Sequence, residues 1–301
     1  MRYAFLGTPE FAAIILDGLI AAVMPSTIVV TNPDRPVGRK RIVPPPPAKT
    51  MAEKYGIKIW QPEKLSAEDW KNNVGEIDFG VVAAYAKILP PEILSIPERG
   101  FIVVHPSLLP RHRGATPIQT AILSGDAVTG ATLILADEKV DHGPVIAKSE
   151  LQIANRNYKE LERVLAELSA DLLIKTIPEW LDGKVKPQAQ NEVYATYTKK
   201  FTTEDGFVDS ADLNDAQNGT SPEKALTIQR MARALNPEPG TWTIITPELI
   251  SIIRTPARHS FSGGGNKRII GKRMKILDAE IKNDALKLKT IQVEGETPKN
   301  L

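Results

Sequence analysis

Short apolar runs alternate with helix-like patterns through the first half of the chain, and this alternation constrains the fold more than any other feature. Residues 3–6, 27–31, 79–84 and 101–104 are apolar or β-branched runs. Residues 9–23, between the first two runs, place their apolar side chains on one helical face. Continuous apolar runs are typical of parallel strands buried on both faces. Strands that alternate with helices predict a right-handed, doubly wound α/β sheet.

A long amphipathic helix and a polar stretch divide the chain. Leucines recur at three- and four-residue spacing between Tyr158 and Gly183. We therefore predict a first domain over residues 1–183, a linker over 184–204 and a second domain over 205–301. In the second domain we expect a short helix that carries Ile228, Met231 and Leu235. Several strand-like runs follow it and predict a small β-barrel: residues 242–245, 249–253, 274–277 and 286–293.

Composition excludes several classes of protein and site. The chain has no cysteine, so it contains no disulfide, thiolate zinc site or cysteine nucleophile. We expect no metal ion. Glu10 and Asp17 interrupt the apolar N-terminal stretch, which fits neither a signal peptide nor a membrane-spanning helix. We therefore expect a cytoplasmic protein with no membrane partner, and a monomer, because nothing in the sequence marks an association surface.

Two basic segments stand out against a net charge of only +2. Residues 254–275 contain seven basic residues and no acidic one. Such a cluster is typical either of a surface that meets a phosphate backbone or of a solvated loop and strand edge. Residues 32–47 form a second basic segment that ends in four consecutive prolines, and we expect that end to be stiff and extended, outside any helix.

A histidine and an aspartate follow two of the predicted strands. His105 comes directly after the run 101–104, and Asp141 follows the strand candidate 131–136. Ligands of open α/β sheets bind beyond the carboxyl ends of the strands. A carboxylate orients a histidine ring and stabilises its cation, so the two residues are candidates for proton transfer. The alternative is that His105 caps a turn and Asp141 belongs to a hairpin.

The residues around this histidine are too irregular for a helix and too apolar for an idle loop. Residues 107–110 form a possible wall for a flat ligand, and Arg111 and Arg113 are candidates to meet an anion. A packed surface loop with solvated arginines is the alternative. Residues 7–11 open the first helix but lack the second and third glycines of a dinucleotide fingerprint, which argues against NAD or FAD.

Several segments together resemble the methionyl-tRNA formyltransferases within the folate-dependent formyltransferase family. Residues 5–11, 32–40 and 105–119 resemble three signatures of these enzymes, and residues 137–144 resemble the second half of their site. The stretch from Arg230 to Gly240 is similar to the start of their second domain. The resemblance covers nearly the whole chain.

This resemblance implies a Rossmann-like first domain and a second domain of the oligonucleotide-binding barrel type. It also implies transfer of a formyl group from 10-formyltetrahydrofolate to the amino group of methionine on initiator tRNA. The implied folate contacts are Tyr85, Ile88, Leu89, Ser107, Leu108, Leu109 and Pro110. The implied tRNA contacts are Arg35, Arg39, Lys40, Arg41, Arg268 and Lys272.

Formyl transfer passes through a tetrahedral intermediate, which calls for a base, an orienting group and an oxyanion donor. His105 and Asp141 match the first two in the family pattern. Val103 stands where the family has its catalytic asparagine, and a valine side chain donates no hydrogen bond. Ala86 also replaces a glycine of the family pattern. The sequence therefore leaves three alternatives: an impaired formyltransferase, a silent homologue that binds tRNA or folate, and an amino-sugar formyltransferase.

Overall fold

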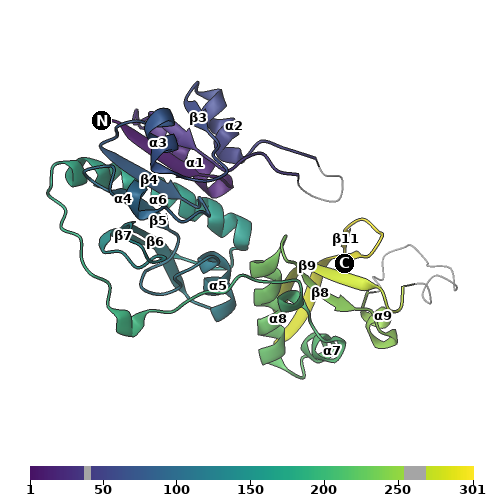
Figure 1. The fold of residues 1–301 in the computed structure, drawn as a ribbon. Coiled ribbons are helices and arrows are strands. Elements are labelled where there is room, and N and C mark those ends of the chain that lie inside the picture. The colour runs from purple at the N-terminus through teal and green to yellow at the C-terminus, as the bar shows by residue number, and fades with distance from the viewer. Residues whose placement is uncertain (37–41, 254–268) are drawn as a thin grey trace. The chain divides into compact units, whose positions relative to one another are not determined.

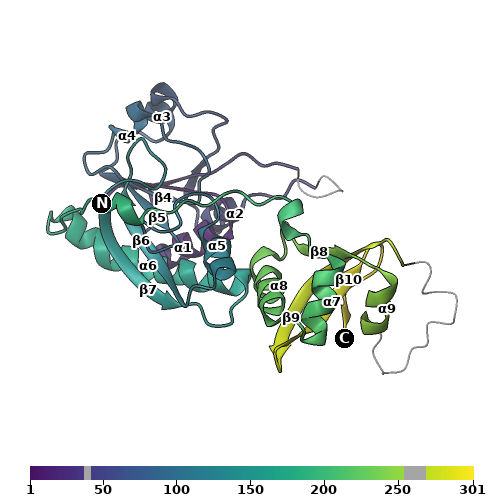
Figure 2. The same cartoon turned by 90° about the horizontal axis from the view of Figure 1, so that it is seen from below.

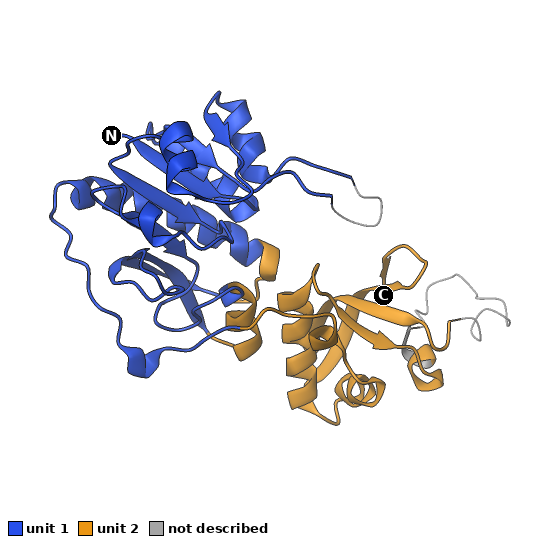
Figure 3. Cartoon of the chain, viewed as in Figure 1, with its two compact units in different colours: residues 1–117, 127–153, 160–198 blue, residues 118–126, 154–159, 199–301 orange. Residues whose placement is uncertain are grey.

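The computed structural model describes residues 1–36, 42–253 and 269–301, and the chain forms two compact units (Figures 1 and 3). Unit 1 comprises residues 1–117, 127–153 and 160–198. Unit 2 comprises residues 118–126, 154–159 and 199–301. The polar segment that begins at Lys184, expected to be a linker, thus belongs to unit 1 as far as Thr198.

Unit 1 contains a seven-stranded sheet in the order β3-β2-β1-β4-β5-β6-β7. The first five of these strands in the chain are parallel, and β6 and β7 add to the β5 edge in antiparallel orientation. The predicted doubly wound α/β sheet is confirmed. Its strands are β1 (Tyr3–Gly7), β2 (Ile28–Val30), β3 (Lys58–Trp60), β4 (Phe79–Ala83), β5 (Phe101–His105), β6 (Val128–Leu135) and β7 (Val145–Gln152).

Both faces of this sheet are covered, as the continuous apolar runs predict. Side chains alternate along a strand, and all of β1 is buried. One face packs against Trp70 and Ile93. Helices α1 and α6 pack against each other: Gly18 of α1 lies against Ala170 of α6, and Figure 2 shows these two helices as neighbours. The helices of unit 1 are α1 (Glu10–Ala21), α2 (Pro47–Lys54), α3 (Ala67–Asn73), α4 (Pro91–Leu94) and α6 (Tyr158–Leu181), whose first two residues fall in unit 2; α5 (Pro117–Ser124) belongs to unit 2 from Ile118 on.

Unit 2 is built around an antiparallel sheet in the order β11-β10-β9-β8, which confirms the predicted β domain. Its core joins Met274, Ile276 and Leu286 of the sheet to Leu213 and Ile228 of two helices. The elements are α7 (Ser210–Asn218), α8 (Pro222–Leu235), β8 (Thr241–Ile244), α9 (Pro247–Ile253), β9 (Arg273–Lys282), β10 (Ala285–Val293) and β11 (Lys299–Asn300).

Two local predictions are wrong, and prolines explain both. Residues 249–253 are helical in α9 rather than a strand, since Pro247 occupies the first helical position, where its fixed φ favours a helix. Pro47, expected outside any helix, is the first residue of α2 for the same reason. A proline there loses no intrahelical hydrogen bond, because the first N–H groups of a helix have no partner inside it.

Within the described ranges, no helix combines the length and the apolar character that crossing a membrane requires.

Candidate functional site

The carboxyl edge of the parallel strands concentrates backbone strain. Eight described residues other than glycine have positive φ; three of them lie in loops that follow β4 and β5 at this edge, and a fourth lies in the β6–β7 loop, which reaches His105. Left-handed backbone costs a residue with a Cβ about 1–2 kcal/mol, and such strain gathers at functional sites. The four are Ala84 (φ 49°), Ala86 (61°), His112 (62°) and Asp141 (50°).

His105 and Asp141 meet at this edge, as the sequence predicts. His105 is the last residue of β5, and Asp141 lies in the loop between β6 and β7. Nδ1 of His105 lies 3.4 Å from Oδ1 of Asp141, and both side chains are largely buried, with 5% and 13% exposed. Oδ2 of Asp141 accepts a hydrogen bond from the N–H of Gly114 at 2.8 Å. The aspartate is thus held between the ring and the loop that follows β5.

The second ring nitrogen of His105, Nε2, contacts a backbone carbonyl, and this contact indicates which tautomer the ring adopts. Nε2 of His105 is 2.9 Å from the carbonyl oxygen of His112. A carbonyl oxygen only accepts, so Nε2 carries a proton. Nδ1 then attracts Asp141 only when another proton lies between them. The geometry therefore leaves Nδ1 and the Asp141 carboxylate as the two groups between which a proton can move in acid–base chemistry.

Arg113 is not solvated, and its partner is a carboxylate of the same unit. Its side chain is 1% exposed and makes a two-pronged ion pair with Glu192, at 2.9 and 2.7 Å. It also donates to Oε1 of Gln190 and to the hydroxyl of Tyr197. The hydrogen bond to Glu192 raises the pKa of Arg113 and lowers the pKa of Glu192. Neither predicted role of Arg113, solvation or binding of an external anion, is correct.

The partners of this arginine come from the segment that the sequence predicts to be a linker. Residues 188–198 lie along the site loops: Gln188 pairs with Val145, and the backbone of Arg113 pairs with Thr196 and Thr198. The mixture of Gln, Asn, Glu and Tyr in this segment offered many hydrogen-bonding groups, which was the available signal. Polarity alone does not distinguish a solvated linker from a segment whose side chains and backbone hydrogen-bond to buried polar groups.

Val103 shares a strand face with His105. Side chains two residues apart on a strand point the same way, and Val103 lies between Val82 of β4 and Ile134 of β6. Its side chain is half-buried. An asparagine at this position would face the same side of the sheet as the histidine, whereas the valine contributes no hydrogen-bond donor there.

The predicted folate residues fall into two groups. The loop after β5 is fixed to β6: the hydroxyl of Thr132 donates to the carbonyl of Ser107 and accepts from the N–H of Leu109. Lys148 donates to the carbonyl of Leu109. Ser107 and Leu109 are buried, and Leu108 and Pro110 are half-buried.

The second group follows β4. Ile88 is 77% exposed, whereas Leu89 is 8% exposed and packs into the core. The Tyr85 side chain is 1% exposed and packs with Trp70 and Phe101. Burial raises the pKa of Tyr85 to about 12. The Tyr85 ring therefore belongs to the core, and it is the backbone around it that lies at the edge of the sheet.

The predicted tRNA residues are placed only in part. Arg35 is 68% exposed and forms an ion pair with Glu63 at 3.1 Å. Lys272 of unit 2 reaches the carbonyl oxygen of Glu294 at 3.5 Å. Arg273 and Lys275 follow it on the exposed side of β9. Arg39, Lys40, Arg41 and Arg268 lie outside the described residues.

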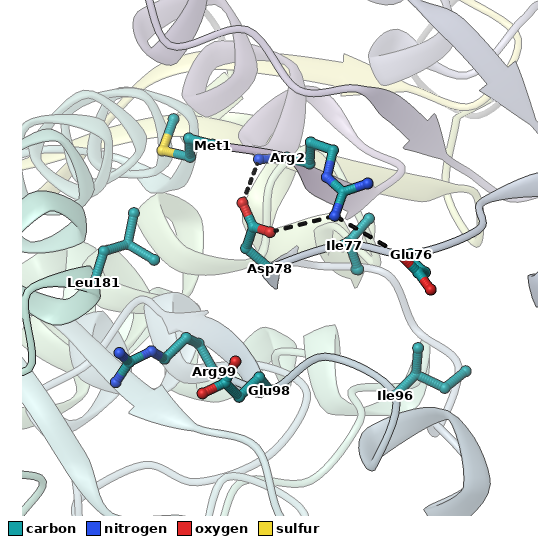
Figure 4. Close-up of a pocket in the computed structure, with 9 residues that line it drawn as sticks. All are labelled: Met1, Arg2, Glu76, Ile77, Asp78, Ile96, Glu98, Arg99 and Leu181. Carbon is teal, nitrogen blue, oxygen red and sulfur yellow. Dashed lines mark hydrogen bonds and ion pairs between the residues drawn. The ribbon is translucent and has the colours of Figure 1, made fainter.

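A hollow of about 620 Å³ lies at the opposite, amino edge of the parallel strands (Figure 4). Arg2, Asp78 and Arg99 line it, and they directly precede or lie close to the starts of β1, β4 and β5. The dashed contacts of Figure 4 join Arg2 to Glu76 and Asp78. Ligands of doubly wound sheets bind at the carboxyl edge, so this hollow is not the candidate site.

Comparison with known families matches most of the chain. Residues 1–177 match the formyl transferase family, and residues 222–300 match the formyl transferase C-terminal domain. The methionyl-tRNA formyltransferase of Herpetosiphon aurantiacus is 35% identical in an alignment of 301 positions that covers 99% of this chain and 95% of that protein.

Two solved structures have the same fold. The methionyl-tRNA formyltransferase from Clostridium thermocellum aligns with a TM-score of 0.56 over 97% of this chain and 98% of that one, at 17% identity. An N-formyltransferase from Helicobacter canadensis, in complex with folinic acid and dTDP-3-aminofucose, aligns with a TM-score of 0.61 over 94% and 88%, at 16% identity. At these identities the likeness concerns the fold alone.

Proposed function

We propose that this chain, which belongs to the formyl transferase family, transfers a formyl group from 10-formyltetrahydrofolate to the amino group of methionine on initiator tRNA. The observation that carries the proposal is the buried His105–Asp141 pair, in which Nδ1 of the histidine at the carboxyl end of β5 lies 3.4 Å from Oδ1 of the aspartate. The 35% identity with a methionyl-tRNA formyltransferase along almost the whole length supports the substrate.

The pair serves the proton steps of the reaction. The methionine nitrogen forms a bond to the formyl carbon and loses a proton, while the bond from that carbon to the folate nitrogen breaks and that nitrogen gains one. His105 and Asp141 can hold and move one proton within a buried site. Asp141 also keeps the ring oriented and stabilises its cation. The side chain of Val103 donates no hydrogen bond to the oxyanion, so we expect slow turnover.

The residues present fit a folate co-substrate. Folate supplies the formyl group. The exposed side chain of Ile88 and the half-buried Leu108 and Pro110 offer apolar surface to a flat ring. The left-handed backbone at Ala84 and Ala86 lies in the same loop as Ile88, and we propose that peptide groups of this loop contact the folate. Apolar walls with a few placed polar groups are typical of such sites.

The initiator tRNA is the proposed partner of both basic segments. Arg35 belongs to the first segment, with Arg39, Lys40 and Arg41, and Lys272 belongs to the second, with Arg268. Arg273 and Lys275 share the exposed side of β9, which suits a phosphate backbone. We further propose that the protein is a cytoplasmic monomer.

An amino-sugar acceptor is the competing proposal, because the Helicobacter canadensis enzyme has the same fold. The 35% identity with a methionyl-tRNA formyltransferase favours the tRNA. The first test is to follow formyl-methionine formation from 10-formyltetrahydrofolate and charged initiator tRNA, with His105→Ala in parallel. We expect turnover that the substitution lowers by about 10²–10⁴-fold. Formylation of an amino-sugar nucleotide without formylation of the tRNA would overturn the proposal.

A further inference from the structure

We propose that Arg113, Gln190 and Glu192, here called the clamp, position the His105–Asp141 pair for catalysis by tying together the two loops that orient it. None of the three is expected to touch the reacting atoms, so they act as positioning residues. The turnover readout of this proposal rests on the proposed function, whereas its geometric readout does not.

Gln190 holds the loop that carries Asp141. Its side-chain Nε2 donates to the carbonyl of Asp141 at 2.9 Å and to the carbonyl of Gly143 at 2.8 Å. Both N–H groups of the amide are therefore used on one loop. This loop adopts left-handed backbone at Asp141, a conformation that costs about 1–2 kcal/mol and persists only where the surroundings hold it.

Arg113 holds the loop that follows β5. Its guanidinium donates from Nε and Nη2 to Oε1 of Gln190, at 3.2 and 2.8 Å. The backbone N–H of Arg113 donates to the carbonyl of Thr196, and the backbone N–H of Thr198 donates to the carbonyl of Arg113. The neighbouring N–H of His112 donates to the Thr196 hydroxyl at 2.8 Å. The His112 carbonyl, which fixes Nε2 of His105, is thus anchored to the same segment.

Gln190 connects the two loops through a single side chain. Its nitrogen reaches the Asp141 loop, and its oxygen reaches Arg113, whose loop carries the His112 carbonyl. Each ring nitrogen of His105 faces one of these loops, Asp141 at 3.4 Å and the His112 carbonyl at 2.9 Å. A change in the clamp therefore alters the geometry on both sides of the ring.

Glu192 supplies the charge that lets a buried arginine hold this place. The Arg113 side chain is 1% exposed, and a buried charge without a partner is strongly destabilising. The two parallel hydrogen bonds to Glu192 fix the plane of the guanidinium. That plane directs Nε and Nη2 at Gln190.

The decisive variant is Gln190→Glu, which keeps size and keeps an acceptor for Arg113. A carboxylate cannot donate, so it faces the carbonyls of Asp141 and Gly143 without hydrogen bonds. Displacement of catalytic groups by about 1 Å costs on the order of 10²-fold in rate. We expect kcat to fall by about that factor at neutral pH while KM for both substrates stays within about threefold. As the pH falls, protonation of the new carboxyl restores one donor, and kcat relative to the unmodified protein rises.

A matched pair elsewhere in unit 1 separates positioning from the loss of any ion pair. Arg163 and Glu167 on α6 form an exposed pair at 2.9 Å. Arg113→Lys and Glu192→Gln are compared with Arg163→Lys and Glu167→Gln, all at temperatures where unfolding curves show a folded protein. We expect kcat to fall by about tenfold or more in the first two variants and to stay unchanged in the second two.

A turnover-independent readout is the ¹⁵N NMR spectrum of the His105 ring in the unmodified protein and in Gln190→Glu. Altered ring-nitrogen shifts support the clamp even where the tRNA is not formylated, in which case the proposed function alone fails. Unchanged ring-nitrogen shifts together with unchanged kcat, in a folded variant, would overturn the clamp. A fall in kcat that is equally large in the α6 variants would also overturn it.

Discussion

The two edges of the seven-stranded sheet use the same kinds of side chain in opposite ways. At the amino edge, Arg2 pairs with Glu76 and Asp78 at 3.9 and 3.8 Å, with 58% of its side chain exposed. At the carboxyl edge, Arg113 pairs with Glu192 at 2.7 Å; 1% of the arginine side chain and 56% of the glutamate side chain are exposed. The first arginine lines an open hollow (Figure 4), and the second lies within a hydrogen-bonded network.

The burial of Arg113 makes the Arg113–Glu192 pair more important for the local structure than the exposed pairs of Arg2. An exposed ion pair contributes about 0–1 kcal/mol because water solvates both partners and side-chain entropy opposes the contact. A buried charge requires a fixed partner, so breaking the pair disturbs everything that the arginine touches. The carboxyl edge also collects left-handed backbone, whereas the residues that line the amino hollow have ordinary φ values in the described chain. Strain and buried charge together distinguish the candidate site from a surface depression.

Among substitutions expected to raise activity at the carboxyl edge, Val103→Asn should have the largest effect. The substitution places an amide on the strand face of His105, where an oxyanion forms. One oxyanion donor is worth about 10²–10³-fold in rate, so we expect kcat for formylation to rise by about that factor, with KM little changed. Steady-state kinetics with initiator tRNA measures it.

Val103→Thr is the matched control, because threonine keeps the shape of valine and adds one hydroxyl donor. We expect a smaller increase than with asparagine, since the hydroxyl is shorter. If both variants fold and neither exceeds the kcat of the unmodified protein, another group already stabilises the oxyanion and the impaired-site interpretation is wrong.

The apolar runs and helical spacings of the sequence predicted most of unit 1, because the local structure that each one favours is also the structure that the α/β sheet requires. The run at 101–104 became β5, and leucine spacing defined α6 to within a residue or two of its ends. His105 lies at the end of β5 as predicted and meets Asp141, but β6 runs antiparallel to β5, so Asp141 reaches the histidine from a loop that begins beside the amino end of β5. The strand predicted at 249–253 was wrong because isoleucine-rich runs suit both states, and Pro247 was the local signal for a helix.

The contacts of the clamp could not be predicted from the spacing of residues in the sequence. Arg113 and Glu192 are 79 residues apart, and no period or spacing relates them. Arginine is usually solvated, so the buried state of Arg113 follows only from the path of residues 188–198. The burial of the Tyr85 ring was not predicted either, because the run at 79–84 gives no sign of the turn at Ala84; the contact of this segment with folate stays a prediction.

Acid should weaken the carboxyl edge through Glu192. Arg113 lowers the pKa of this carboxyl below its ordinary value of 4.5, and His142 and Lys139 act in the same direction. A depressed folded-state pKa gives stability that is complete above the unfolded value and is lost as pH falls through the folded one. Urea unfolding of the unmodified protein and Glu192→Gln should therefore differ above the ordinary pKa of 4.5 and converge as the pH falls through the lowered pKa of Glu192. A difference that stays constant across this range contradicts the prediction.

Ala86→Gly tests the backbone strain of this edge. The φ of Ala86 is 61°, and its side chain is exposed. Glycine removes a left-handed penalty of about 1–2 kcal/mol, and its greater freedom in the unfolded chain offsets about 0.5–1 of that. We expect the free energy of unfolding to rise by up to about 1 kcal/mol. Ala67→Gly, at an exposed helical position with ordinary φ, should lower it instead. Equal effects from both would remove strain as the explanation.

The smallest effect is expected at the amino edge, from Arg2→Ala. The substitution removes two exposed ion pairs but leaves the hydrogen bond from the Arg2 N–H to Asp78 at 2.7 Å, because that bond uses the backbone. Exposed pairs of this kind contribute about 0–1 kcal/mol, so the free energy of unfolding should fall by no more than about that amount. Turnover should not change, since the hollow lies at the edge opposite His105. A loss of kcat in folded Arg2→Ala comparable to that of Arg113→Lys would mean that both edges serve the reaction, and the contrast between them would no longer mark the functional one.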